Sequence, residues 1–454
     1  MLEMTPAPEP TGTATGIWSL NTSRNDRGEL EVAGVNVRDI AREFGTPSYV
    51  LDEADMRERA RAWKVAMDEA FGDLAGADVY YAGKAFLSKA VARWMIDEGL
   101  NIDTSSEGEL RTALAAGVPG DRIGLHGNNK SNAEIELALD EGISHIVIDS
   151  LYEVEQVAAI ATQRGLRAPV YVRLTTGVHA GGHDFIQTAH EDQKFGLSVT
   201  SGAAQEAIAA IASHESLHLV GLHSHIGSQI LSTDGFGEAA KVVLSMRQWA
   251  AEQGIDIAEV DLGGGYGVRY TSNDAAPPAP PEFAAVLARA VHEHMAESGL
   301  PAPRISIEPG RSVVAPAMMT LYRVGAIKDV QTDSGPRRYI SVDGGMSDNL
   351  RPALYGAQYT AAVASRQPGG ELVRSRVVGK HCESGDIVVH DVGLPTDAVG
   401  GDLLAVPVTG AYGRSMGSNY NMLSRPGVIA VRDGRAYEIV RRETIDDQLA
   451  LDVG

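Results

Sequence analysis

Two spacings of apolar residues alternate along the chain, and together they predict strands and helices in turn. Short apolar runs bounded by Gly, Pro, Asn or Asp predict buried β-strands. Longer segments with apolar residues every three or four positions predict helices that cover those strands with one face. The predicted strands span residues 79–84, 100–103, 123–126, 145–149, 170–174, 217–225, 258–262 and 305–308.

Helical spacing fills the intervals between these strands, in residues 89–98, 107–116, 133–141, 152–164, 202–212, 235–253 and 281–298. Eight strands alternating with seven helices predict an α/β protein built on a (β/α)8 TIM barrel. A doubly wound parallel sheet has a similar alternation and is the competing interpretation.

After residue 315 the apolar segments become short and rich in β-forming residues. They cover residues 318–324, 339–342, 371–378, 386–389, 403–408 and 428–431. Asp433-Gly434 lies between two alternating segments and predicts a tight hairpin. We therefore expect a disordered tail at residues 1–16, a barrel at 46–315, and a mostly β domain made of 17–45 and 316–454.

Three segments outside the barrel pattern also have a predicted structure. Residues 34–44 and 53–71 have helical spacing, and residues 47–51 form a short strand. Residues 177–196 are too long and polar for a simple connection, so we expect an active-site or interface loop there.

The charge of the chain narrows the range of partners that we expect. Its 39 basic and 60 acidic residues give a formal net charge of −21, which argues against binding to nucleic acid or to an anionic membrane surface. The single cysteine, Cys382, excludes an intramolecular disulfide and a thiolate metal cluster. Residues 1–16 lack the basic and apolar regions of a signal peptide, and no apolar run is long enough to span a membrane. We expect a cytoplasmic protein.

Candidate chemistry gathers where the predicted barrel strands end, because that face carries the active site in barrel enzymes. The strand ends are Lys84, Asp103, His126, Asp149, His225, Gly263–Gly265 and Glu308. A lysine at such a position can bond covalently to a carbonyl group, although a single lysine is more often a solvated surface charge.

Three of these strand ends fit parts of one ligand. Gly263-Gly264-Gly265 can direct backbone amides at a phosphate, or can form only a tight turn. His223 and His225 share one face of their strand; no third histidine or carboxylate is evident nearby, so we expect no metal site. An imidazole stacked on a flat ring is favoured over a packed structural histidine. Glu308 can hold a protonated ring nitrogen and Arg311 an anionic group, with strand-end capping as the alternative.

Lysine, glycine loop, histidine and glutamate together indicate pyridoxal 5′-phosphate (PLP) bound to Lys84 as a Schiff base. Longer motifs surround these residues: YAGKA (81–85), HGNNKS (126–131), HIGSQ (225–229), DLGGGYG (261–267), EPGR (308–311), RPALYG (351–356), CESGD (382–386), GAYG (410–413) and SNYN (418–421). Through them, from about residue 34 to residue 424, the chain resembles the diaminopimelate decarboxylases of the fold-type III, alanine-racemase-like family of PLP enzymes. The first five motifs also resemble ornithine and arginine decarboxylases, whereas Arg351 with Tyr355, CESGD and SNYN favour the diaminopimelate branch.

The resemblance implies a role for each matching residue. Lys84 would carry PLP, and Cys382 would reprotonate the carbanion that remains when CO2 departs. The implied cofactor-binding residues are Lys84, His225, Ser228, Gly264, Gly265, Glu308, Gly310, Arg311 and Tyr412. The implied substrate-binding residues are Arg311, Arg351, Tyr355, Glu383 and Tyr412.

The resemblance also implies a reaction and an assembly. The reaction is decarboxylation of meso-2,6-diaminopimelate to L-lysine, the last step of lysine biosynthesis. The assembly is a homodimer, in which the residues matching Cys382 and Glu383 come from the other subunit. Two alternatives stay open: a decarboxylase of another amino acid or of a carrier-bound substrate, and a PLP-binding relative without catalysis. The segment Arg173–Gly177 departs from the family pattern, because it lacks the expected Asn-Pro or Lys-Pro.

Overall fold

The computed structural model of the protein describes residues 6–10, 16–178, 194–333 and 335–454. Its chain divides into two compact units. One unit comprises Arg59–Gly267 and Pro277–Gly310, and the other comprises the residues up to Glu58, Val268–Ala276 and Arg311–Gly454. Residues 1–5 and 11–15 of the expected tail, and residues 179–193 of the expected loop, lie outside the described residues.

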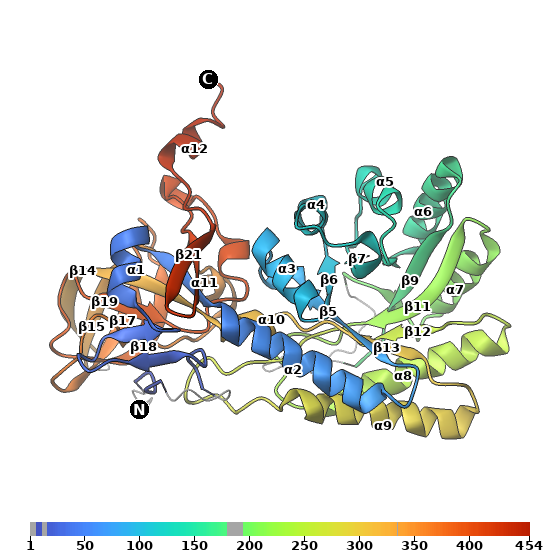
Figure 1. Cartoon of the computed structure of the whole chain (residues 1–454), viewed down its shortest axis with the longest axis horizontal. Coiled ribbons are helices and arrows are strands. Elements are labelled where there is room, and N and C mark those ends of the chain that lie inside the picture. The colour runs from blue at the N-terminus through green and yellow to red at the C-terminus, as the bar shows by residue number, and fades with distance from the viewer. Residues whose placement is uncertain (1–5, 11–15, 179–193, 334) are drawn as a thin grey trace. The chain divides into compact units, whose positions relative to one another are not determined.

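The first unit is a closed barrel of eight parallel strands, which confirms the expected fold (Figure 1). The strands are β5 (Ala77–Ala82), β6 (Asn101–Thr104), β7 (Ile123–Leu125), β8 (His145–Ile148), β9 (Ala168–Thr175), β11 (Leu217–Ser224), β12 (Glu259–Asp261) and β13 (Arg304–Ile307). Closure comes from the pairing of β13 with β5, and the short β10 (Leu197–Ser198) adds to β9. Lys84, His225 and Glu308 each lie just beyond a strand and not within it, because the backbone leaves the sheet there.

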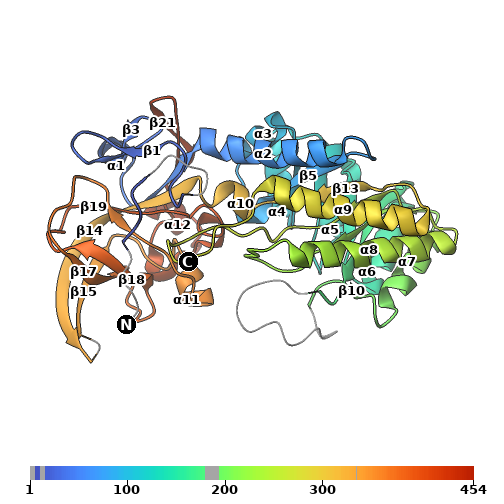
Figure 2. The same cartoon turned by 90° about the horizontal axis from the view of Figure 1, so that it is seen from below.

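Helices follow the barrel strands, as the spacing predicted. They are α3 (Lys89–Asp97), α4 (Glu107–Ala115), α5 (Asn132–Asp140), α6 (Leu151–Arg164), α7 (Ala203–Ser213), α8 (Asp234–Glu252) and α9 (Pro280–Ser298). Helices α8 and α9 lie side by side along the barrel (Figure 2). Serine hydroxyls accept the amide three residues ahead at the start of four successive helices, at Ser88, Ser106, Ser131 and Ser150. Such caps fix where each helix begins, and so fix the loop that precedes it.

The second unit is built on a mixed β-sheet, in which most pairs are antiparallel, with short helices. Its elements before the barrel are β1 (Thr22–Arg24), β2 (Leu30–Val32), β3 (Val35–Asn36), α1 (Val37–Phe44), β4 (Ser48–Asp52) and the start of α2 (Glu53–Phe71). Those after it are α10 (Arg311–Val314), β14 (Met318–Thr332), β15 (Gly335–Val342), α11 (Arg351–Tyr355), β16 (Ala362–Val363), β17 (Leu372–Val378), β18 (Ile387–Pro395), β19 (Leu403–Val406), β20 (Val428–Arg432), β21 (Arg435–Val440) and α12 (Ile445–Leu449). The hairpin expected at Asp433-Gly434 is confirmed between β20 and β21.

The boundary between the units differs from the expected barrel of residues 46–315. Strand β4 pairs antiparallel with β14 and parallel with β20, so it lies inside the β-sheet of the second unit. All five of its residues are buried. Its apolar sequence resembles that of a barrel strand, and only the long-range pairing with residues near 318 and 428 assigns it to the other sheet.

A buried ion pair ties two loops of the barrel unit together. The Lys130 ammonium donates to Oε1 of Glu153 at 2.9 Å and to the carbonyl oxygen of Gly127 at 2.7 Å. The other carboxylate oxygen of Glu153 accepts the backbone N–H of Asp149 at 2.8 Å. Both side chains have at most 4% of their surface exposed, so each charge depends on the other.

We expect Lys130→Met to lower the free energy of unfolding by about 3–5 kcal/mol, because Glu153 keeps a buried charge without its partner. The double variant Lys130→Met/Glu153→Gln should recover much of that loss, since it leaves no charge unpaired and its amide can still accept from Asp149. Urea unfolding of wild type, Lys130→Met, Glu153→Gln and the double variant measures both effects. Strictly additive losses would show that the two residues are not coupled.

Candidate active site

Lys84 projects from a turn at the end of the first barrel strand. Strand β5 ends at Ala82, and a 3-10 turn over Gly83–Ala85 exposes the lysine while its two neighbours are buried. Gly310 packs against this turn so closely that a Cβ there would lie 2.9 Å from Cβ of Ala82. The close approach of two strand ends therefore holds the backbone on either side of Lys84 in place.

The glycine loop after β12 adopts backbone conformations that other residues avoid. Gly263 has φ +66° and Gly265 has φ +115°. The amide of Gly264 donates to Nδ1 of His225 at 3.3 Å, so that ring nitrogen carries no proton. Burial lowers the pKa of His225 well below its usual range, and the imidazole is therefore neutral with its proton on Nε2. Gly264, expected to bind phosphate, here orients the histidine.

Aromatic packing anchors this glycine loop from below. Tyr266 directly follows Gly265 and stacks on Phe236 of α8, with ring centroids 4.8 Å apart and planes at 5°. Trp63 lies 4.3 Å from the same tyrosine ring, and Phe283 of α9 lies 4.9 Å from it. Sequence reasoning missed this anchor, although the aromatic residue inside a run of glycines was a possible indication.

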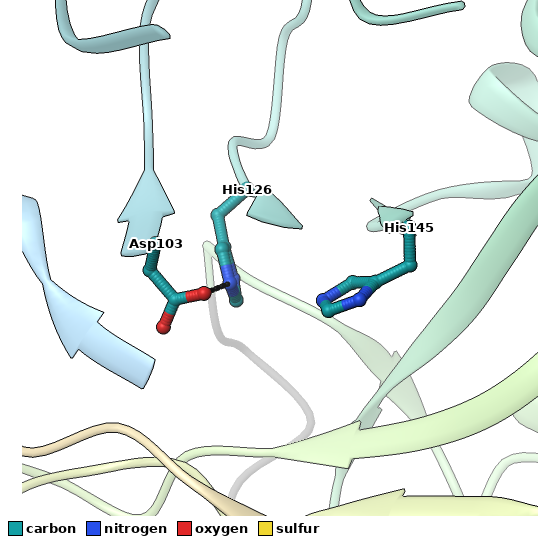
Figure 3. A group of neighbouring side chains, drawn as sticks. All are labelled: Asp103, His126 and His145. Carbon is teal, nitrogen blue, oxygen red and sulfur yellow. Dashed lines mark ion pairs between the residues drawn. The ribbon is translucent and has the colours of Figure 1, made fainter. Parts of the chain in front are cut away.

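Glu308 is the centre of a buried polar cluster. Its Oε1 lies 2.8 Å from Nε2 of His223 and 3.4 Å from Nε2 of His126. The same His126 nitrogen lies 3.2 Å from Oδ1 of Asp103, and His145 lies beyond it (Figure 3). The sequence analysis marked most of these positions as strand ends but gave His126, Asp103 and His223 no role in the site.

Burial and mutual contact set the charges of this cluster. Burial raises the pKa of Glu308, but His223 and His126 outweigh that effect and hold its pKa well below the usual range. Burial lowers the pKa of both histidines to about 4, so they are neutral. Burial, followed by the charge of Glu308, raises the pKa of Asp103 well above its usual range. The same two causes act on Asp261. The negative charge of the cluster therefore resides on Glu308.

The sequence analysis found no third metal ligand near His223, but the fold supplies two. The ligand atoms of His126, His223 and Glu308 lie within 4.8 Å of one another, and so do those of Asp103, His126 and His145. This spacing can accommodate a metal ion. A hydrogen bond from a neutral imidazole to a carboxylate accounts equally well for the 2.8 Å contact.

Two buried arginines share an aromatic cluster in the second unit. The Arg351 guanidinium lies 4.7 Å above the ring of Tyr270 and donates to the hydroxyl of Tyr359 at 2.6 Å. Arg311 donates to the Tyr270 hydroxyl at 2.5 Å and lies 4.8 Å from the ring of Tyr412. The structure thus brings three expected residues together through Tyr270 and Tyr359, which sequence reasoning missed because no motif marks them.

Tyr355 does not join this cluster. The two residues begin and end the five-residue helix α11, yet Arg351 is buried and 65% of the Tyr355 surface is exposed. The resemblance implied that both residues bind the substrate. In this chain the two side chains therefore have different surroundings. Ser228, which was expected to bind the cofactor, is also exposed, in the loop after β11.

Cys382 and Glu383 lie in an exposed loop that the SNYN segment supports. The amide of Cys382 donates to Oδ1 of Asn421 at 3.2 Å, and the ring of His381 stacks on Tyr420. Glu383 accepts the amide of Gly385 at 3.1 Å, and this hydrogen bond holds its pKa below the usual value. Two motifs that are separate in the sequence are therefore one structural feature.

The chemistry of these residues fits PLP. Lys84 offers an exposed amine, and the glycine loop permits a close approach of backbone to a phosphate. Glu308 offers a buried anion for a cationic ring nitrogen, and His225 has a neutral, oriented ring.

Comparison with known proteins agrees with this assessment. The family model described as "Pyridoxal-dependent decarboxylase, pyridoxal binding domain" matches residues 53–315. A diaminopimelate decarboxylase of Mycobacterium tuberculosis is 50% identical over 446 residues, which cover 97% of this chain and 98% of the relative. The chain belongs to the diaminopimelate decarboxylase family.

Other relatives extend the similarity. A diaminopimelate decarboxylase of Bacillus subtilis is 44% identical over 95% of this chain and 97% of its own length. The crystal structure of diaminopimelate decarboxylase from M. jannaschii in complex with L-lysine has a TM-score of 0.89 and 31% identity, over 96% of this chain and 98% of that one. Within the described residues, no helix is long and apolar enough to cross a membrane.

Proposed function

We propose that this protein is a PLP-dependent decarboxylase that converts meso-2,6-diaminopimelate to L-lysine. The observation that carries the choice of substrate is Arg351, of which only 6% is exposed. In the described part of the chain no carboxylate forms an ion pair with it, and aromatic rings surround it instead. A buried cation without an acidic partner is costly, and a carboxylate of the substrate would relieve that cost.

The barrel residues bind the cofactor and fix its position. PLP supplies, when bound, a conjugated ring that accepts the electron pair left by departing CO2. Lys84 would be the covalent attachment point, Glu308 would hold the ring nitrogen, and His225 would hold the face of the ring. The remaining cofactor-binding residues would be Ser228, Gly264, Gly265, Gly310, Arg311 and Tyr412.

Residues of the second unit recognise the distal end of the substrate. Diaminopimelate has an amino acid group at each end, so the enzyme must react at one end and recognise the other. Arg351 binds the distant carboxylate, with Arg311 and Tyr412 beside it. Glu383 is anionic and exposed, which suits the distant ammonium, and Tyr355 contributes from the surface.

The protein acts as a homodimer in this proposal, in a cytoplasmic location. Cys382 and Glu383 lie in an exposed loop, as residues that serve a neighbouring subunit must. Cys382 delivers the proton to the carbon that has lost CO2, so each active site needs residues of both chains.

The direct test is CO2 release from meso-diaminopimelate with and without added PLP, within a panel that includes ornithine, arginine and lysine. Lys84→Ala should fold normally, lose the visible absorbance of lysine-bound PLP, and lose catalysis because its attachment point is gone. A preference for another member of the panel would refute the substrate assignment. If Lys84→Ala still formed a protein–PLP adduct that borohydride can trap, the assignment of Lys84 as the attachment point would be refuted.

Arg351→Met should lower kcat/KM for meso-diaminopimelate by about 10- to 150-fold, because a hydrogen bond to a charged group is lost. An amino acid without the distal carboxylate should lose much less, since it makes no such bond. Arg351→Lys is the matched control that retains the charge but not the planar fork. If the ratio of the two kcat/KM values stays unchanged in Arg351→Met, the arginine has only a structural role.

Homodimers of Lys84→Ala and of Cys382→Ala should each be nearly inactive. Mixed and allowed to exchange subunits, they should recover about a quarter of wild-type activity, because half of the random pairs are heterodimers with one intact site. Native mass spectrometry verifies the exchange. Activity that stays at the parental level despite exchange would show that sites are not shared.

A further inference from the structure

The contacts of Glu308 are unequal between its two carboxylate oxygens. Both imidazole contacts fall on Oε1, from His223 at 2.8 Å and from His126 at 3.4 Å. The two histidines come from different strands, β11 and the end of β7, and their rings pack edge to face with centroids 5.2 Å apart. The carboxylate is therefore held from one side, which leaves Oε2 for another donor.

The histidines can serve as donors because they are buried and neutral. His223 is 1% exposed and His126 is 8% exposed. A neutral imidazole has one N–H, and Nε2 of each ring lies near Oε1 of Glu308. An ionised carboxylate oxygen has no proton to donate, so it can act only as an acceptor. The 2.8 Å contact with Oε1 favours the His223 tautomer that carries its proton on Nε2. Nε2 of His126 lies between Oε1 of Glu308 at 3.4 Å and Oδ1 of Asp103 at 3.2 Å, so its contact with Glu308 is the weaker one.

The groups around this carboxylate favour a single negative charge on it. Each barrel strand, or the turn directly after it, contributes a charged or titratable side chain that acts on the cluster: Lys84, Asp103, His126, His145, Arg173, His223, Asp261 and Glu308 itself. The two neighbouring aspartic acids are buried and have pKa values raised well above the usual range. The imidazoles near Oε1 thus favour the ionised form of Glu308, whereas the two aspartic acids stay protonated.

We propose that His223, and more weakly His126, are positioning residues that hold Oε1 of Glu308 and thereby aim Oε2 at the ring nitrogen of PLP. Their N–H groups fix the rotamer of the carboxylate and preserve its charge at that point. The proposal rests on PLP as the cofactor of this chain. It assigns a function to two buried histidines that do not touch the substrate.

Two variants of His223 distinguish a hydrogen-bond donor from a ring that only fills space. His223→Met fills a similar volume without any N–H, whereas His223→Gln keeps an amide donor of similar reach. His294 is the matched control, because it is 8% exposed on α9 and makes no contact with Glu308. The dissociation constant of PLP is measured for each full-length protein by absorbance titration after cofactor removal, together with kcat and KM.

His223→Met should bind PLP about 10- to 150-fold more weakly, because Glu308 loses a hydrogen bond to its charged form. At saturating PLP its kcat should fall while KM for meso-diaminopimelate stays near the wild-type value, since the effect acts on the ring and not on substrate recognition. His223→Gln should recover most of both losses, and His294→Met should match wild type. His126→Met should show the same pattern with a smaller loss, in keeping with its longer contact.

Wild-type PLP affinity and kcat in His223→Met would overturn the proposal, and so would equal losses in His223→Gln and His223→Met. If His223→Met does not fold, His126→Met carries the test, and unchanged affinity and kcat in that variant would overturn it. None of these results affects the proposed reaction, which fails separately if wild type releases no CO2 from meso-diaminopimelate.

Discussion

A negative charge buried inside the barrel is the constraint on which its chemistry depends. Moving a carboxylate out of water costs several kcal/mol unless hydrogen bonds replace the lost hydration. The groups closest to Glu308 are the imidazoles of His223 and His126, at 2.8 and 3.4 Å, and in the proposed role their N–H groups offset this cost. A cation in permanent contact would neutralise the carboxylate, whereas neutral donors leave its charge to act on a cationic ring nitrogen. The polar cluster is thus arranged for a ligand and not for stability alone.

The second unit has the opposite imbalance. Arg311 and Arg351 lie around the same tyrosine, Tyr270, and both are nearly buried. Tyrosine rings stabilise a guanidinium through their negative faces but do not neutralise it. Two cations that share aromatic neighbours therefore create a positive site, and the ligand that suits it is a carboxylate or phosphate. The barrel unit thus holds the buried carboxylate of Glu308, and the second unit holds the buried guanidinium of Arg351, with which no carboxylate of the described residues forms an ion pair.

The fold could be predicted from the sequence further than the site could. Barrel strands are continuous apolar runs, so their spacing located β5 to β13 to within a few residues. Strand β4 has the same character, but its partners lie more than 250 residues away and local pattern cannot reveal them. Lys84, Glu308 and the glycine loop could be recognised because barrel geometry gives strand ends a meaning. Tyr270 and Tyr359 follow no such rule, and the exposure of Tyr355 depends on how one short helix packs.

If Arg351 binds the distal carboxylate as proposed, its burial would also explain how one fold can separate two classes of substrate. An attractive contact alone favours diaminopimelate by the strength of one charge-assisted hydrogen bond, about 1.5–3 kcal/mol. Discrimination grows when the wrong substrate leaves a buried polar group without a partner, because the desolvation of that group is then not repaid. In the proposed site, ornithine would bring no second carboxylate to Arg351. Because only 6% of this residue is exposed, a missing carboxylate would then be a penalty and not merely a weaker contact. Selectivity in such a site follows from the charge that the protein leaves unpaired, as much as from the contacts that it forms.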